Sequence, residues 1–159
     1  MVALVATVSM RAEEHAVASL ILTPGVSASE LNLKHNNDTV RLSNIKGKYV
    51  LVQFWANAAE GSLKKCIEMN IAVNHSKSKK IEMVAVSFEP IKLIYDELAK
   101  KSDLNGAKPT TIEDGVYSDM YQRYRLSKGL NNYLLNEYGV IVARDLNPAD
   151  LAMYDKGKQ

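Results

Sequence analysis

Two apolar runs on either side of an amphipathic segment constrain the fold of this chain most strongly. Residues 49–55 are apolar except at Gln53, which is typical of a central strand covered on both faces, and residues 81–88 predict a second such strand. Between them, residues 59–75 predict a helix with one apolar side, formed by Leu63, Cys66, Ile67, Met69, Ile71 and Val73. A strand, a helix and a strand in this order predict a parallel pair of strands.

The flanking sequence predicts further elements around this unit. Residues 30–34 and 39–42 alternate apolar and polar side chains, which indicates an N-terminal hairpin. A helix is expected to begin at Pro90 and to end at Asn105-Gly106, with its inner face formed by Ile91, Ile94, Tyr95 and Leu98. Downstream we expect an extended segment over 107–112, a small helix carrying Tyr117, Tyr121 and Tyr124, a hairpin of strands 131–135 and 140–144, and a last helix from Asn147-Pro148 to Tyr154.

Length and charge exclude several classes of function. The chain has 159 residues, enough for one domain, and its formal net charge of +2 comes from 20 basic and 18 acidic side chains spread along the sequence. Such a chain has no basic patch for nucleic acid. The single cysteine excludes an internal disulfide and a cysteine-based zinc site, and the histidines lack metal-ligand spacing, so we expect neither a metal nor a cofactor.

The N-terminal residues are interpreted separately from the rest. The turn at Thr23-Pro24-Gly25 divides an extension over 1–23 from a domain over 24–159. Residues 1–8 are apolar but too few to span a bilayer, so we expect no transmembrane segment there. They fit either the remnant of a signal peptide or a first strand.

Two segments carry a resemblance to a known family. "GKYVLVQFWA" (residues 47–56) resembles the "GKYVLVNFWA" lead-in of TlpA-like and AhpC/TSA-type thiol-disulfide oxidoreductases, which are exported bacterial relatives of thioredoxin. "NNYLLNEYGVIVAR" (residues 131–144) is similar to their "TTFLIDKDGKIVAR" hairpin. The resemblance implies an α/β thioredoxin fold, a central mixed sheet flanked by helices with an N-terminal hairpin, in a protein of the periplasm or cell envelope.

The departures from the family pattern fall on its chemistry. Where the family has its CxxC dithiol, this chain has Ala59, Glu60, Gly61 and Ser62, and Leu130 occupies the position of the family's cis-proline. Exchange requires a thiolate at a helix N-terminus and a second thiol that resolves the mixed disulfide. A methyl group and a hydroxyl can do neither, so dithiol exchange at this site is excluded. Ser62 also lacks a neighbouring histidine in the sequence, which favours a structural serine over a nucleophile.

Three functions compete at this level, and the sequence leaves open whether the chain is an enzyme. The first is a redox-inactive accessory protein that binds an envelope protein or a small ligand. The second is a redox enzyme, an oxidoreductase or a peroxidase-like protein, that uses Cys66 with a partner's thiol, although the predicted buried position favours a structural cysteine. The third is a ligand-binding module built on the tyrosines or on the helix N-terminus. The ligand, the partner and the oligomeric state are not determined by the sequence.

Overall fold

The computed structural model describes residues 24–25, 27–28, 32–35, 38–41, 48–78, 80–89, 92–107, 110–112, 115–124 and 126–156. The extension or signal remnant predicted for residues 1–23 lies outside these ranges. Within them, none of the helices has the length and apolar character needed to cross a bilayer.

The predicted mixed sheet is confirmed, and it has five strands in the order β5-β4-β3-β6-β7. Its central strand β3 (Tyr49–Trp55) runs parallel to β4 (Ile81–Ser87), with Tyr49 opposite Ile81, and antiparallel to β6 (Asn132–Leu135). Strand β7 (Ile141–Arg144) pairs antiparallel with β6, and the short β5 (Thr110–Thr111) pairs parallel with β4. The N-terminal hairpin, β1 (Asn32–His35) with β2 (Asp38–Arg41), forms a separate sheet.

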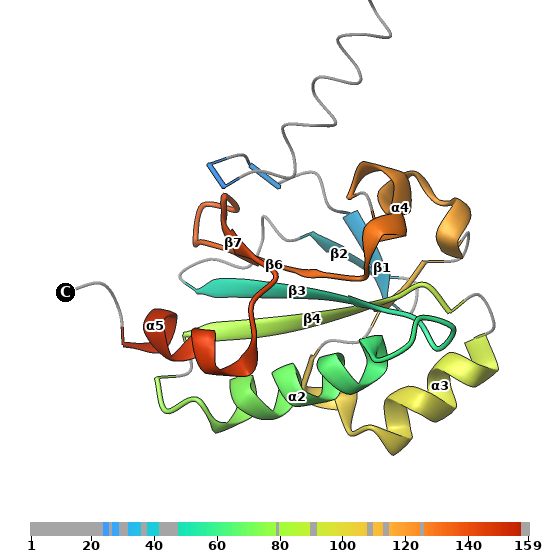
Figure 1. The fold of residues 1–159 in the computed structure, drawn as a ribbon, viewed down its shortest axis with the longest axis horizontal. Helices are drawn as coiled ribbons and strands as arrows, with labels where there is room; N and C mark the ends of the chain where they lie inside the picture. Colours follow the sequence, from blue (N-terminus) through green and yellow to red (C-terminus); the bar gives the residue numbers. More distant parts are fainter. Residues whose placement is uncertain are drawn as a thin grey trace, which may run out of the picture.

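Helices cover both faces of the five-stranded sheet (Figure 1). One face carries α2 (Ser62–His75), α3 (Lys92–Lys101) and α5 (Leu151–Asp155), and the other carries α4 (Asp119–Arg123). Short 3-10 helices connect them at Leu104–Ala107, Gly115–Tyr117, Leu126–Lys128 and Pro148–Asp150. The Asp155 carboxylate accepts hydrogen bonds from the hydroxyls of Ser76 and Ser78, which fasten the end of α5 to the turn after α2.

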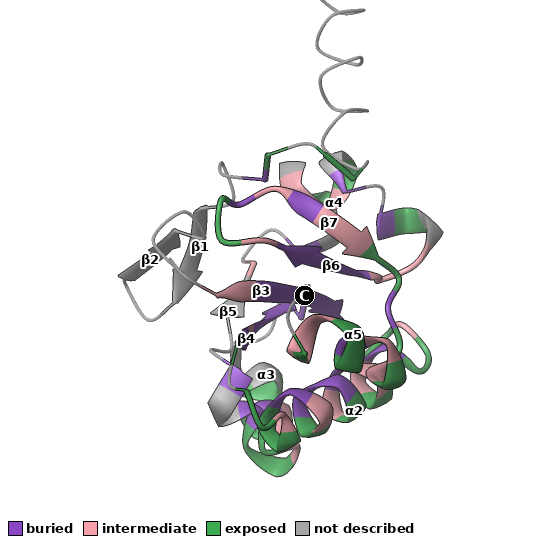
Figure 2. Ribbon diagram, turned by 90° about the vertical axis from the view of Figure 1, so that its left-hand side faces the viewer, coloured by how far each residue is buried: buried purple, intermediate pink, exposed green. Residues whose placement is uncertain are grey.

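Alternating side chains of the strands form two separate cores. The strands β3, β4 and β6, which supply many of these side chains, are buried over most of their length (Figure 2). The α4-side core includes Val50, Val52, Phe54, Val84, Val86, Phe88, Tyr124, Leu126, Tyr133 and Leu135. The α2-side core includes Leu51, Trp55, Cys66, Met69, Val73, Met83, Ala85, Leu104, Leu134, Leu146 and Leu151. A strand places successive side chains on opposite faces, so β3, β4 and β6 each contribute to both cores.

Helix α2 differs from its prediction at two points. It begins at Ser62 and not at residue 59, because Gly61 precedes it in the left-handed conformation, with φ 73°. Its buried face is formed by Ser62, Cys66, Met69, Asn70 and Val73, so Ile71 points outward and is 51% exposed. Asn70 replaces Ile71 on the inner face because its amide donates a hydrogen bond of 3.0 Å to the carbonyl of Asp103.

The segment after β4 also departs from the prediction. Helix α3 ends at Lys101 and not at Asn105-Gly106, because Asp103 adopts a left-handed conformation with φ 49° that Asn70 holds in place. Ile94 is exposed and Ala99 is buried. Pro90, Ile91 and the side chain of Tyr95 lie outside what the structure describes. Ala107 belongs to a 3-10 helix, and among the described residues of 107–112 the strand β5 covers Thr110–Thr111.

Candidate functional site

The candidate site is the connection between β3 and α2, and it consists of two consecutive turns. The amide of Ala59 donates to the carbonyl of Ala56 at 3.1 Å, and the amide of Ser62 donates to the carbonyl of Ala59 at 3.1 Å. Gly61 stands at the N-cap position of α2 with φ 73° and ψ −11°. We call residues 56–62 the site turn. The position of the family's first cysteine, Ala59, therefore lies in a turn outside the helix.

Ser62, at the position of the family's second cysteine, has a structural role in the site turn. Its Oγ accepts a hydrogen bond from the amide of Ala56 at 3.1 Å and donates one to the carbonyl of Ala56 at 2.8 Å. The side chain is 8% exposed. Both the proton and an acceptor lone pair of the hydroxyl are used by the backbone, which is the arrangement of a fastening group and not of a nucleophile next to a base.

No histidine side chain that the structure describes lies beside Ser62. His75 is at the far end of α2, where its Nδ1 lies 2.8 Å from the carbonyl oxygen of Ile71. This contact with its own helix accounts for the position of the His75 ring.

Ala59 and Leu130 contact the same core from two different connections. Both are half-buried and pack against the α4-side core, together with Ile112, Met120 and Tyr121. Leu130 precedes β6, and the carbonyl of the next residue, Asn131, accepts a hydrogen bond of 3.2 Å from the amide of Phe54 at the end of β3. Among the described residues there is no cis peptide bond, so Leu130 continues the chain with a trans bond.

Glu60 and its neighbours form the outer surface of the site turn. Asn57, Ala58, Glu60 and Gly61 are all exposed, whereas Ala56 and Ser62 are buried. The site turn therefore presents a short polar surface above a half-buried methyl group.

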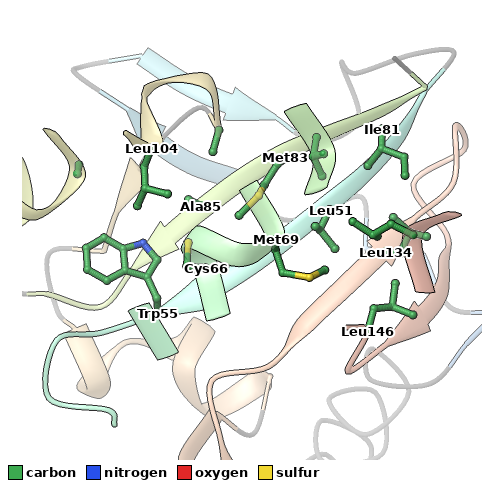
Figure 3. Packing of buried hydrophobic residues seen from close by; sticks show 14 residues of the cluster. Leu51, Trp55, Cys66, Met69, Ile81, Met83, Ala85, Leu104, Leu134 and Leu146 are labelled. Atoms are coloured by element: carbon green, nitrogen blue, oxygen red, sulfur yellow. The ribbon is translucent and has the colours of Figure 1, made fainter. Parts of the chain in front are cut away.

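Cys66 lies in the other core. It is fully buried in the α2-side core, in the cluster that contains Trp55, Met69 and Leu104 (Figure 3). Burial in these apolar surroundings raises the pKa of the thiol to about 12. The sheet separates this core from the side chain of Ala59, so the structure does not bring the candidate thiol to the site turn. The predicted burial of Cys66 is confirmed.

The three tyrosines do not form one continuous stripe. Tyr117 belongs to a 3-10 helix and is 90% exposed. Tyr121 packs edge-to-face on Phe88, with the ring centroids 5.2 Å apart, and Tyr124 is buried beside Phe54 at the same centroid distance. Two of the three therefore pack in the α4-side core, and the three rings do not lie on one surface along a single helix.

A buried amide pair next to the site was not identified from the sequence. Asn132 Nδ2 donates to Gln53 Oε1 at 3.1 Å and to the carbonyl of Leu146 at 2.9 Å, and Asn132 Oδ1 accepts from the amide of Leu146 at 2.8 Å. Gln53 Nε2 donates to the carbonyl of Phe54 at 2.9 Å. Gln53, the polar residue within the apolar run 49–55, was the available signal. The pair thus consists of two uncharged amide side chains that bond to one another inside the sheet, immediately before the site turn.

In the described part of the chain, no group of histidine, cysteine or carboxylate side chains is arranged to hold a metal ion.

This chain is similar to known proteins in sequence and in structure. No family model matches the chain. The thiol-disulfide oxidoreductase ResA of Oceanobacillus iheyensis is 27% identical over 99 residues, which cover 62% of this chain and 51% of ResA. The chain thus spans about half the length of the curated relative it matches.

Solved structures agree with this match. A thioredoxin-like protein from Parabacteroides distasonis superposes with a TM-score of 0.75 and 29% identity, over 86% of this chain and 96% of that protein. ResA and this solved structure both point to the thioredoxin-like thiol-disulfide oxidoreductases. The thioredoxin domain of such an enzyme from Bacteroides vulgatus, at 22% identity, has a TM-score of 0.71 over 85% of this chain and 96% of that domain. The predicted thioredoxin fold is confirmed.

Proposed function

We propose that this thioredoxin-like protein does not exchange disulfides and acts by binding a partner protein of the bacterial envelope at the site turn. The proposal rests on one observation: at both positions where the family has cysteines, this chain has a side chain with structural contacts. Ala59 packs against a core, and the Ser62 hydroxyl is bonded to the backbone of Ala56. The single thiol of the chain is buried on the opposite face of the sheet.

The proposed binding surface is the half-buried apolar rim around the site turn. It consists of Ala59, Ile112, Met120, Tyr121 and Leu130, which all pack on the α4-side core. These residues come from four segments: the site turn, the residue after β5, helix α4 and the residue before the β6 connection at Asn131. The segments meet at the carboxyl ends of β3 and β4, where α/β sheets commonly bind ligands. The Phe88 amide, which donates to the Trp55 carbonyl at 2.9 Å, joins the two strand ends beneath the rim. An extended apolar segment of a partner protein fits the chemistry of this rim.

The location of the protein follows from the resemblance to exported relatives. The family resemblance, carried by residues 47–56 and 131–144, implies the periplasm or cell envelope. We infer that the partner is met in that compartment.

The test compares a variant in the half-buried rim with a variant on the exposed surface, both in the native host. Leu130→Asp places a carboxylate in the apolar rim and should abolish cross-linking of the protein to its partner. Tyr138→Asp changes a residue of the β6–β7 turn that is 77% exposed, and it should leave cross-linking unchanged. Equal cross-linking of both variants, with both proteins folded by circular dichroism, would contradict the rim as the binding surface.

A further inference from the structure

The backbone of the site turn differs from what dithiol exchange requires, independently of the missing thiols. A reactive thiol of the thioredoxin type depends on the positive end of a helix, and this effect falls off within the first turn. Helix α2 has Gly61 at its N-cap and makes its first helical hydrogen bond from the amide of Lys65 to the carbonyl of Gly61, at 2.9 Å. Ala59 lies two residues before this N-cap.

The amide that a group at position 59 would use is already occupied. In the first turn of a helix, the amide three residues onward is available to the N-cap side chain. Here the amide of Ser62 donates to the carbonyl of Ala59 itself, at 3.1 Å. A thiolate at position 59 would therefore lack both this donor and the favourable end of the helix dipole.

Two residues hold the site turn in this form. Gly61 has φ 73°, a conformation that side chains with a Cβ disfavour, and a Cβ placed there would meet no atom within 4 Å. The conformation therefore depends on backbone preference and not on a lack of space. The Ser62 hydroxyl adds the second constraint by bonding both polar groups of the Ala56 backbone.

We propose that Gly61 and Ser62 form a conformational lock that keeps residues 59–61 out of helix α2, so that a thiol supplied at position 59 is not activated. The proposal deepens the proposed function, because it rests on the same turn. Its test measures the ionisation of an introduced thiol and requires neither a partner nor disulfide exchange, so the two proposals can fail separately.

The experiment introduces Ala59→Cys and measures the thiol pKa from the pH dependence of alkylation, with peptide mapping to distinguish it from Cys66. With Gly61 and Ser62 intact, the pKa should not fall below the ordinary value of a cysteine thiol, because position 59 is half-buried and lies outside the helix. In the released variant, which adds Gly61→Ala and Ser62→Ala, residues 59–61 can join the helix, and the pKa should fall by about one unit or more. Gly61→Asn, the matched control, tolerates the left-handed conformation and should leave the pKa unchanged.

Specific values of the thiol pKa would contradict the proposed lock. A depressed thiol pKa in Ala59→Cys alone would show that position 59 already senses the helix N-terminus, and it would overturn the lock. An unchanged pKa in a folded released variant would overturn it as well. If the released variant does not fold, Gly61→Ala alone is compared with Gly61→Asn: the lock predicts that the Ala variant has the lower thiol pKa and the lower Tm, and equal values would refute it.

Discussion

Ser62 connects the end of β3 to the beginning of α2 through one hydroxyl. Its Oγ lies 3.1 Å from the Ala56 amide nitrogen and 2.8 Å from the Ala56 carbonyl oxygen, in a buried position. A buried amide that loses its acceptor costs free energy, since water cannot reach it to replace the bond. The stability of the protein should therefore respond to this residue.

Ser62→Ala should lower the free energy of unfolding by about 1–3 kcal/mol, because it leaves the buried Ala56 amide without its acceptor and removes one of the two hydrogen bonds to the Ala56 carbonyl. Urea denaturation monitored by the fluorescence of Trp55 measures the change. Ser127→Ala, at an exposed serine, is the control and should change the free energy by less than about 0.5 kcal/mol. Equal effects of the two substitutions on the free energy of unfolding would contradict the structural role of Ser62.

Cys66 should make stability depend on pH in the alkaline range. Its thiol pKa is about 12 in the folded protein, against an ordinary value of 9.0. Below pH 9 the thiol is protonated in both states. Between about pH 9 and 12 only the unfolded state ionises, so the free energy of unfolding falls as pH rises.

The measurement compares the native protein with Cys66→Ala by urea denaturation at pH 8 and pH 10. The native protein should lose about 1 kcal/mol more than the variant over this interval. Burial also raises the pKa of Tyr133 to about 12, but this contribution is present in both proteins and cancels in the comparison. Parallel pH dependences would show that Cys66 is ionisable in the folded state.

Among the elements, the buried amide pair determines how the C-terminal part joins the sheet. Asn132 in β6 bonds Gln53 in β3 and both backbone groups of Leu146, which lies between β7 and α5. Leu146 and Leu151 then enter the α2-side core. One side chain thus fixes two neighbouring strands and the start of the connection to α5.

Asn132→Ala should lower the free energy of unfolding by about 2–4 kcal/mol, because it leaves the buried Leu146 amide and carbonyl and the Gln53 amide oxygen without partners. Hydrogen exchange should show faster exchange at Leu146 and through α5. Asn57→Ala, at an exposed asparagine of the site turn, is the control and should leave both unchanged. Unchanged exchange at Leu146 in Asn132→Ala would contradict this account.

The sequence predicted the strands better than the helix boundaries. Strands β3, β4, β6 and β7 follow from apolar runs and a glycine-ended turn, and the structure reproduces them within one residue. The start of α2 was misplaced because Gly61 is compatible with a helical pattern. The left-handed conformation of Gly61 and the hydrogen bond between Ser62 and Ala56 show that the helix begins after Gly61. The end of α3 likewise depends on Asn70, through a contact between helix α2 and the turn after α3.

The candidate site was predicted by resemblance and not by periodicity. Positions 59–62 and 130 were identified from the family pattern, and Ala59 and Leu130 pack on the same core. The separation of Cys66 from Ala59 required the structure, because opposite faces of the sheet are assigned only when the register of α2 on the sheet is known. The role of Gln53 with Asn132 was missed, since their pairing joins residues 79 positions apart.

At the scale of the whole molecule, we propose a thioredoxin fold that is retained without the redox chemistry of the family. The fold places the carboxyl ends of β3 and β4 beneath the site turn, and it places the single thiol in the core on the other side of the sheet. A thiol with a pKa of about 12 supplies almost no thiolate at neutral pH. The chain should therefore neither attack a disulfide nor resolve one.

The most direct measurement is the rate at which the native protein accelerates the reduction of insulin disulfides by dithiothreitol at pH 7, beside a dithiol-containing thioredoxin as the positive control. The account predicts the uncatalysed rate, and the same rate for Cys66→Ala. A rate clearly above the uncatalysed one that Cys66→Ala abolishes would contradict it, because the buried thiol would then be the catalyst.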